Sequence, residues 1–340
     1  MSRASGVTIR DVARRAGVSI AAVSMALNGT GSLSEATRIR VRAVAAEMDY
    51  QADALARGLR RSSVGAVGIV MRALDALGEY QPRGVDVFAR YIATMATQAM
   101  ERGLSAMLVP DPTRGERPPL ALSLDGYIVA QPVLDDPVVA LFERRGIPYV
   151  TLGRDPGRPD FTDWVGEDPA ATIRALDLLG GRGARSVALL RGTDVNDWNL
   201  ENEQIYRDWC AGRGVRPRVY TAAERDGESG GRRAARVISA EGLPDGIFAL
   251  TGRHAVGVLH ELQAQGVPVP TRTMIATASD SEHTRHSRPA ITAIEIDVDG
   301  TARALLDLLQ ARIRGERAPG PVLTSARLRR RASTRPAPQR

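Results

Sequence analysis

The 340-residue sequence contains no lysine, a single cysteine and no apolar run long enough to cross a membrane. With one cysteine, Cys210, the chain can form neither an internal disulfide nor a cysteine-rich metal site, and we expect Cys210 to be a small buried hydrophobic residue. A membrane span needs roughly 18 consecutive apolar residues, so a transmembrane protein is excluded. Residues 1–6 have no apolar segment of the kind found in secretory signals. We therefore expect a cytoplasmic protein, long enough for two domains, that carries no cofactor or metal.

Positive charge is concentrated at the two ends of the chain. Residues 1–61 hold ten arginines and five acidic residues, and residues 326–340 hold six arginines and no acidic residue. The totals of 46 basic and 39 acidic residues leave 30 arginines and 34 acidic residues for residues 62–325, a net charge of −4. A basic terminal segment on a mildly acidic body indicates nucleic-acid binding at one end. The alternative interpretation is that this positive charge only keeps the protein soluble.

The first 50 residues have the pattern of three short helices. Thr8 followed by Asp11 predicts a capping box, and the helix that it starts ends at Gly17. Ser19 is expected to cap a second helix that runs to Asn28, and Ser34 a third. The apolar residues at helical spacing that we expect to form a small core are Ile9, Val12, Ala13, Ala16, Val23, Ala26, Leu27, Ile39 or Val41, Val44, Ala45 and Met48.

The tight connection of residues 16–19 predicts that the first two helices form a helix-turn-helix. In such a motif the second helix enters the major groove of DNA with its N-terminus first. Ile20, Ala21, Ala22 and Ser24 would then face outward, the alanines towards thymine methyl groups and Ser24 towards a phosphate or a base edge. A generic three-helix bundle is the alternative. The adjoining basic charge favours the helix-turn-helix over this alternative.

The N-terminal segment closely resembles the DNA-binding headpiece of the lactose-repressor (LacI/GalR) family. The matching residues are Thr8, Ile9, Asp11, Val12, Ala13, Ala16, Gly17, Val18, Ser19, Val23, Ser24, Leu27, Asn28, Gly29, Ser34, Thr37, Arg38 and Tyr50. The resemblance implies a short hinge helix at residues 53–60 that folds only on operator DNA, where Leu59 would wedge into the minor groove. The DNA-binding residues that follow from it are Thr8, Ser19, Ile20, Ala21, Ala22, Ser24, Asn28, Ser34, Thr37, Tyr50, Ala56, Arg57 and Leu59.

Three positions depart from the family pattern. Ala22 stands where the family usually has threonine, Met25 where it has arginine, and Asp53 where it has asparagine. We expect the lost polar contacts to weaken or change base readout. Arginines that contact phosphates would compensate and would make binding more dependent on salt. The candidates are Arg10, Arg14, Arg15, Arg57 and Arg60.

After residue 63, short apolar runs alternate with helical stretches, which predicts doubly wound parallel sheets. The expected strands are 64–70, 105–109, 126–130, 148–152, 186–190, 246–250 and 273–277, and the expected helices lie near 85–101, 169–180, 197–213, 229–240, 253–265 and 299–314. So many strands fit two sheets better than one. The resemblance to the LacI/GalR family extends over most of this region and implies a periplasmic-binding-protein-like core of two subdomains that grip a ligand.

Ligands of such sheets bind at the carboxyl ends of the strands, so the segments after residues 70, 130, 152, 190, 250 and 277 are expected to form the pocket. The family's sugar-binding positions are only partly kept: Glu201 replaces an arginine, Thr251 begins the segment that replaces an Asn-Asp pair, and Ser279-Asp280 replaces an Asp-Asp pair. A plain sugar effector is therefore less expected. Trp198 would stack on a ring or simply pack, and Asp280 would bind the ligand or simply be solvated. The predicted effector-binding residues are Asp280, Trp198, Glu201 and Thr251.

Two segments match catalytic or metal-binding patterns, but we do not expect either to form such a site. Residues 227–231 match the G-x-S-x-G nucleophile elbow, but no buried strand precedes them, so we expect a loop that leads into the helix from Arg232. His283 and His286 have metal-ligand spacing but no further ligands in a polar segment, so we expect solvated histidines. Without lysine there is no phosphate-binding P-loop.

The predicted organisation is an all-α helix-turn-helix headpiece (1–51), a hinge helix and linker (52–62), an α/β core of two doubly wound subdomains for effector binding and dimerisation (63–328), and a disordered basic tail (329–340). The predicted function is a dimeric, sequence-specific transcriptional regulator, expected to be a repressor, that binds palindromic double-stranded operator DNA and a small-molecule effector such as a sugar or related metabolite. A ligand-binding protein with a degenerate headpiece is the second hypothesis. An enzyme on this fold is the third, and it lacks a catalytic constellation.

Overall fold

The computed structural model describes residues 7–28, 30–48, 50, 63–71, 87–115, 120–316 and 320–334. The chain divides into two compact units, Met1–Val64 and Gly65–Arg340. The predicted hinge helix at residues 53–60 lies outside the described residues. None of the helices in the described ranges is both long and apolar enough to cross a membrane.

The N-terminal unit contains the three predicted helices, α1 (Ile9–Ala16), α2 (Ile20–Asn28) and α3 (Glu35–Glu47). Seven residues form its buried core: Val12, Ala13, Ala16, Val23, Ala26, Val41 and Ala45. Of the two alternatives for α3, Val41 is fully buried and Ile39 is 60% exposed. The apolar spacing in the sequence therefore identified the inward face of each helix.

Local hydrogen bonds explain where these helices begin and end. The Asp11 carboxylate accepts hydrogen bonds from the backbone N–H of Thr8, at 3.0 Å, and from its hydroxyl, at 2.6 Å. Gly17 ends α1 in the left-handed conformation with φ 63°, which suits glycine because it has no Cβ. Ser19 accepts from the backbone N–H of Ala22 and Ser34 from that of Thr37, so both predicted N-caps are confirmed.

The second unit contains two six-stranded sheets, each the centre of one subdomain. The first sheet has the order β11-β5-β4-β3-β1-β2, with all strands parallel. Its strands are β1 (Ala66–Met71), β2 (Ser105–Leu108), β3 (Gly126–Ala130), β4 (Tyr149–Leu152), β5 (Trp164–Glu167) and β11 (Val322–Thr324). The second sheet has the order β12-β10-β9-β8-β6-β7 and is parallel except for β12, which is antiparallel to β10. Its strands are β6 (Val187–Arg191), β7 (Arg218–Thr221), β8 (Gly246–Ala249), β9 (Met274–Thr277), β10 (Thr292–Ile296) and β12 (Ala326–Arg329).

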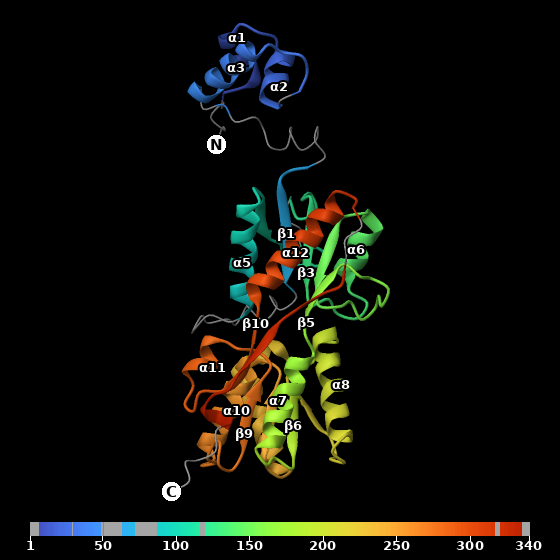
Figure 1. Ribbon diagram of the computed structural model, residues 1–340, viewed down its shortest axis with the longest axis vertical. Helices are drawn as coiled ribbons and strands as arrows, with labels where there is room; N and C mark the ends of the chain where they lie inside the picture. The colour runs from blue at the N-terminus through green and yellow to red at the C-terminus, as the bar shows by residue number, and fades with distance from the viewer. Residues whose placement is uncertain are drawn as a thin grey trace. The chain divides into compact units, whose positions relative to one another are not determined.

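Helices pack beside each sheet (Figure 1). The helices of the first subdomain are α5 (Val87–Glu101), α6 (Pro137–Arg145) and α12 (Val298–Ile313). Those of the second are α7 (Ala170–Gly181), α8 (Asp197–Ala211), α9 (Gly227–Ala240), α10 (Gly252–Ala264) and α11 (Glu282–His286). The predicted class, a helix-turn-helix unit with a two-subdomain parallel α/β core, is confirmed.

The chain passes between the two subdomains three times, near Asp168, Asp297 and Ser325. Backbone hydrogen bonds tie these crossings together, from Asp168 N to Thr324 O at 3.0 Å and from Asp297 N to Ser325 O at 3.2 Å. The hydroxyls of Thr301 and Thr324 lie 2.9 Å apart and both are buried. The three crossings therefore form one hydrogen-bonded junction.

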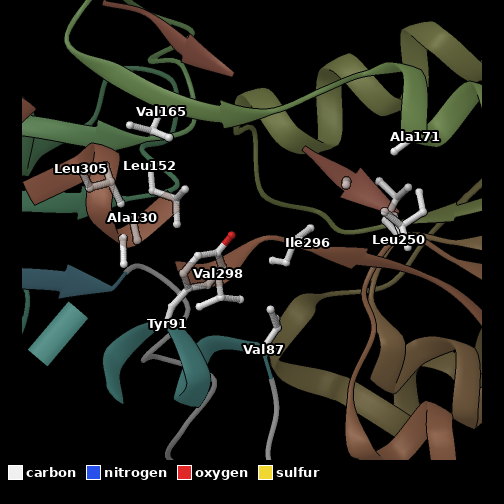
Figure 2. Packing of buried hydrophobic residues seen from close by; sticks show 14 of the residues in the cluster. Val87, Tyr91, Ala130, Leu152, Val165, Ala171, Leu250, Ile296, Val298 and Leu305 are labelled. Carbon is white, nitrogen blue, oxygen red and sulfur yellow. The ribbon is translucent and has the colours of Figure 1, made fainter. Parts of the chain in front are cut away.

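A single apolar cluster extends through both subdomains. It includes Val67 and Ile69 of the first sheet and Leu189 and Phe248 of the second. Figure 2 shows part of it, with Tyr91 of α5 among Ala130, Leu152 and Ile296. Cys210 is fully buried in this cluster, which confirms its predicted role as a small hydrophobic residue.

The expected strands and helices of the core lie within two residues of the observed ones, but several elements were missed. The missed elements are β5, β7, β10, α6, β11 and α11. The expected disordered tail began too early: β12 ends at Arg329, and Ser333 and Thr334 are buried in a 3₁₀ turn. Ser333 accepts a hydrogen bond from Thr292 N and donates one to Ile275 O, so this part of the tail completes the second subdomain. Residues 335–340 lie outside the described residues.

Candidate functional site

The first candidate site is the surface of α2 in the N-terminal unit. Ile20 is 46% exposed and Ala21 is exposed, whereas Ala22 and Ser24 are half-buried. Val23 and Ala26 on the opposite face are fully buried. The beginning of α2 therefore presents a small, largely apolar surface, as its sequence predicts.

Several of the other predicted DNA-binding residues also have structural roles. Thr8, Ser19, Ser34 and Thr37 take part in the helix caps, and Tyr50 packs against the core of the unit. A cap residue lies at a helix start, where its backbone N–H groups are also able to meet a phosphate. Ala56, Arg57 and Leu59 lie outside the described residues, as does the side chain of Asn28.

Exposed arginines on α1 and α3 give the N-terminal unit positive charge. Arg14 and Asp11 form an ion pair at 3.2 Å, Arg15 and Glu47 one at 3.9 Å, and Arg38 and Glu35 one at 3.7 Å. Within the described part of the N-terminal unit, the exposed Arg10, Arg40 and Arg42 make no ion pair. These three guanidinium groups are the ones best placed electrostatically to bind phosphate.

The second candidate site is a cavity of about 290 Å³ between the two subdomains of the second unit. Its lining is mostly apolar, with Met71, Phe88, Tyr91, Ile92, Leu152, Trp198 and Ile296 among its members. Most of its polar members lie at or after the carboxyl ends of strands, where the sheet topology predicts them: Gln131, Glu167, Asp194, Asn196, Glu224, Thr251, Arg253 and Ser279. A smaller cavity of about 40 Å³ adjoins it and shares Gln131, Leu152, Glu167, Trp198 and Ala278 with it.

The four predicted effector-binding residues differ in whether they line a cavity. Trp198 lines both cavities, from the first turn of α8. Thr251 lines the larger cavity and caps α10, since its hydroxyl accepts from His254 N at 3.3 Å. Glu201 lines the smaller cavity. Asp280 lines neither cavity and is 2% exposed.

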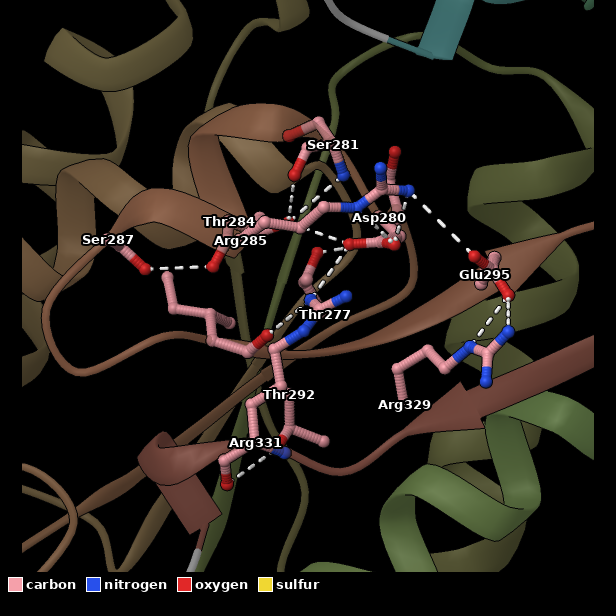
Figure 3. Close-up of polar contacts among 12 residues, drawn as sticks. Thr277, Asp280, Ser281, Thr284, Arg285, Ser287, Thr292, Glu295, Arg329 and Arg331 are labelled. Atoms are coloured by element: carbon pink, nitrogen blue, oxygen red, sulfur yellow. Dashed lines mark hydrogen bonds and ion pairs between the residues drawn. The ribbon is translucent and has the colours of Figure 1, made fainter.

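The Asp280 carboxylate is instead the centre of a polar network that joins α11 to the C-terminal segment (Figure 3). It accepts hydrogen bonds from Arg285 and Arg331, both at 2.8 Å, and from the Thr284 hydroxyl at 3.0 Å. Burial opposes the charge of this carboxyl, but the hydrogen bonds from Arg331 and Arg285 outweigh burial and hold its pKa below the ordinary value. Neighbouring side chains already occupy both carboxylate oxygens, and Asp280 lines neither cavity. The prediction that Asp280 binds the effector is therefore wrong.

Three lining residues that the sequence did not single out have unsatisfied polar groups. Tyr91 is 3% exposed, and its hydroxyl has no hydrogen-bond partner in the described structure. The same holds for the side-chain oxygen of Gln131, a residue with φ 56° that directly follows β3. The Glu167 carboxylate, at the end of β5, accepts no hydrogen bond and makes no ion pair with a described residue. In the sequence, only the positions of Gln131 and Glu167 at strand ends and of Tyr91 on a helix indicated that these residues line the cavity.

Glu167 and Glu201 interact electrostatically across the smaller cavity. Burial, followed by the charge of Glu201, raises the pKa of Glu167 to about 7. Burial also raises the pKa of Glu201, with a further contribution from Asp197, while Arg154 acts in the opposite direction. Glu167 thus titrates near neutral pH because its charge is poorly compensated.

The two catalytic or metal-binding patterns do not form such sites. Residues 227–231 were expected to form a loop, but they are the first residues of α9. The Ser229 hydroxyl donates a hydrogen bond to Asp226 O. The preceding strand, β7, ends at Thr221, so the elbow geometry is absent from this segment. No group of three or more His, Cys, Asp and Glu residues within the described ranges is placed to hold a metal ion.

Two family models match the chain, one in each unit. Residues 8–53 match the bacterial regulatory proteins of the lacI family, and residues 176–334 match the periplasmic binding protein-like domain. Catabolite control protein A of Staphylococcus epidermidis is 26% identical over 85% of this chain and 87% of its own length. The transcriptional regulator CelR of Thermobifida fusca is 26% identical over 93% and 94%, and the repressor PurR of Salmonella enteritidis is 25% identical over 91% of each chain.

Solved structures agree with these matches. The lac repressor dimer bound to operator and an anti-inducer has a TM-score of 0.80 at 20% identity and covers 97% of this chain and 99% of its own. A complex of CelR with cellobiose has a TM-score of 0.69 at 24% identity, over 96% and 99%. A helix-turn-helix unit joined to a two-subdomain core with a cavity between the subdomains defines a DNA-binding transcriptional regulator. The chain belongs to the LacI/GalR family of such regulators.

If Asp280 has a structural role, Asp280→Asn destabilises the protein without any ligand. We expect the free energy of unfolding, measured by urea titration, to fall by about 3 kcal/mol, since the substitution removes the buried charge that pairs with Arg285 and Arg331. Asp160→Asn, at an exposed loop position, is the control and is expected to have little effect. Equal stability of the two variants would contradict the structural role.

Glu167→Gln is expected to stabilise the protein at alkaline pH only. The folded pKa lies above the unfolded value near 4.5, so the protonated form favours folding, and this contribution is lost as pH rises through about 7. At pH 8 the variant should be more stable than the parent by about 1–3 kcal/mol, and the difference should vanish near pH 4.5. Unfolding free energies across this range test the prediction, and a difference independent of pH would refute it.

Proposed function

We propose that this regulator is a homodimeric repressor that binds a palindromic operator. A small molecule in the cavity between its subdomains would control this binding. The observation that carries the proposal is that one chain combines a family DNA-binding unit, residues 8–53, with a cleft-bearing two-subdomain core. Since its DNA lies in the cytoplasm, we place the protein there. Its relatives are regulators, and we propose that it catalyses no reaction.

In this proposal α2 enters the major groove with its N-terminus first. Ile20 and Ala21, which are exposed there, would contact base edges, with Ala22 and Ser24 beside them. Arg10, Arg40 and Arg42 would bind phosphates in sequence-independent contacts. Leu59 would wedge into the minor groove at the centre of the operator, as the family resemblance implies.

The effector would act through the three crossings between the subdomains. A ligand that contacts both walls of the cavity favours one angle between them, and the three crossings are covalent links that a change of angle must bend. Trp198 and Thr251 are the predicted residues that line the main cavity, and Glu201 lines the adjoining one. The altered angle would change the spacing and order of the two hinge segments in the dimer and thereby the affinity for operator.

Ala22 and Met25 favour a second candidate function, a ligand-binding protein whose headpiece has lost specific DNA binding. Both replace polar family residues at positions where base readout is expected. DNA binding by such a protein would rest on phosphate contacts alone and would collapse at physiological salt, whereas base contacts retain affinity there.

Leu59→Ala tests the wedge at the operator centre. We expect at least about a tenfold loss of operator affinity and little change for random DNA, because only a specific complex is kinked. Leu55→Ala, in the same segment, is the matched control. Fluorescence anisotropy with labelled duplexes measures both affinities, and equal losses on the two DNAs would exclude the wedge role.

Ser24→Ala tests base readout by α2. We expect operator affinity to fall by a factor of about 5–10, the scale of one lost hydrogen bond, with random-DNA affinity unchanged. Ser32→Ala, at an exposed position outside α2, is the control. An unaltered operator affinity would remove Ser24 from the readout residues.

A further inference from the structure

The described residues that line the two cavities carry a marked excess of negative charge. They include six carboxylates, Asp168, Asp194, Asp197, Glu167, Glu201 and Glu224, and one guanidinium, that of Arg253. Field lines from like charges are concentrated in a cleft with low-dielectric walls, so such a cleft attracts cations. This charge distinguishes the cavity from one that only accommodates neutral molecules.

Neighbouring groups already satisfy three of these carboxylates. Asp197 pairs with Arg154 at 2.8 Å, and Asp168 accepts from Ala170 N at 3.0 Å. Glu224 accepts from Asn199 at 2.7 Å and from the backbone N–H of Thr193 at 3.1 Å. Within the described structure Glu167 and Glu201 accept nothing, although both are partly buried and line the same small cavity.

The two unpaired carboxylates come from opposite subdomains. Glu167 ends β5 in the first sheet, immediately before the first crossing, and Glu201 lies on α8 of the second subdomain. Their negative charges therefore repel each other across the cleft, and a positive charge between them would draw the two subdomains together. The pair lies at the place where the angle between the subdomains is set.

The adjoining larger cavity has room for an apolar body. Trp198 lies at the boundary, because it lines both cavities, and an indole face attracts a cation as well as a flat ring. The hydroxyl of Tyr91, which is 3% exposed, and the side-chain oxygen of Gln131 also line this space without a hydrogen-bond partner in the described structure. Unsatisfied buried polar groups of this kind indicate a ligand that completes them.

We propose that the effector is an organic cation whose ammonium, amidinium or guanidinium group binds between Glu167 and Glu201 while its apolar body fills the larger cavity against Trp198. This assignment rests on the proposed effector function of the cleft and names the chemical class of its ligand. An organic cation is favoured over a metal ion because no cluster of three metal-ligating side chains occurs among the described residues. A neutral sugar would leave both carboxylates uncompensated.

The test is a pair of probes of nearly equal size, 2-phenylethylamine and 2-phenylethanol, titrated into the full-length protein by calorimetry at pH 8. The amine should bind at least about tenfold more tightly than the alcohol, since only the amine carries a charge. Glu167→Gln and Glu201→Gln should each remove most of this preference without weakening the alcohol. Asp208→Asn, which removes an exposed charge from α8, should leave it intact.

The pH dependence gives a second readout. The raised pKa of Glu167, about 7, means that amine affinity should fall by about tenfold from pH 8 to pH 6, whereas the Glu167→Gln variant should show a flatter profile. The charged or titratable groups beside Glu167 are Glu201 and Asp197 from α8 and Asp168, which line the same small cavity, and Tyr91 from α5. Arg154, after β4, acts on Glu201.

An amine that binds no more tightly than the alcohol overturns the proposal, as does a preference that survives both glutamine substitutions. Phenyl β-D-glucoside separates this failure from failure of the proposed function. If this neutral probe binds the cleft and alters operator affinity while the amine does neither, the cleft is an effector site for another class of ligand. If the protein binds no operator at all, the proposed function itself fails, whatever the amine does.

Discussion

The junction of three crossing segments is the constraint on which the rest of the core depends. Thr301, Thr324 and Gly166 belong to three different segments, and their groups are in contact: the two hydroxyls lie 2.9 Å apart, and Thr324 donates to Gly166 O at 3.1 Å. Thr301 also donates to Asp297 O at 2.8 Å. Two hydroxyl protons thus serve three contacts, which together link the three segments.

The position of the cavity follows from this junction. Parallel strands place their carboxyl ends at one edge of each sheet, and the crossings hold these two edges towards each other. Side chains that follow β3 and β6 therefore meet those at the start of α10 although they are distant in sequence. Glu167 occupies a special position here because it is at once a cavity residue and the last residue before a crossing.

Much of the fold was predictable from the sequence because its signals are local. Apolar spacing identified the inward faces of α1 to α3, and Gly17, Ser19 and Ser34 marked their ends. β5 and β7 were missed because each has four residues, with only one buried residue in β5 and none in β7, so neither forms an apolar run. The missed α6 had usable signals, since Asp136 caps it, proline opens it and Gly146 ends it.

The site was less predictable than the fold because its chemistry depends on contacts between distant segments. The strand-end rule located the pocket segments, but it did not distinguish residues that face the cavity from those that face a neighbour. Asp280 follows β9, as a pocket residue would, yet Arg331 from the C-terminal segment, 51 positions away, occupies it. Glu167 was overlooked for the converse reason, since its strand was not recognised and its lack of a partner is visible only in three dimensions.

Regulation by this chain depends on its recognition of a specific DNA sequence. The most direct test is selection of genomic fragments by the full-length protein, followed by affinity measurement at 0.15 M salt. The account predicts an enriched palindromic sequence bound at least about a thousandfold more tightly than random DNA. Fragments without a shared sequence, bound weakly and lost as salt rises, would contradict it and would support a ligand-binding protein with a degenerate headpiece.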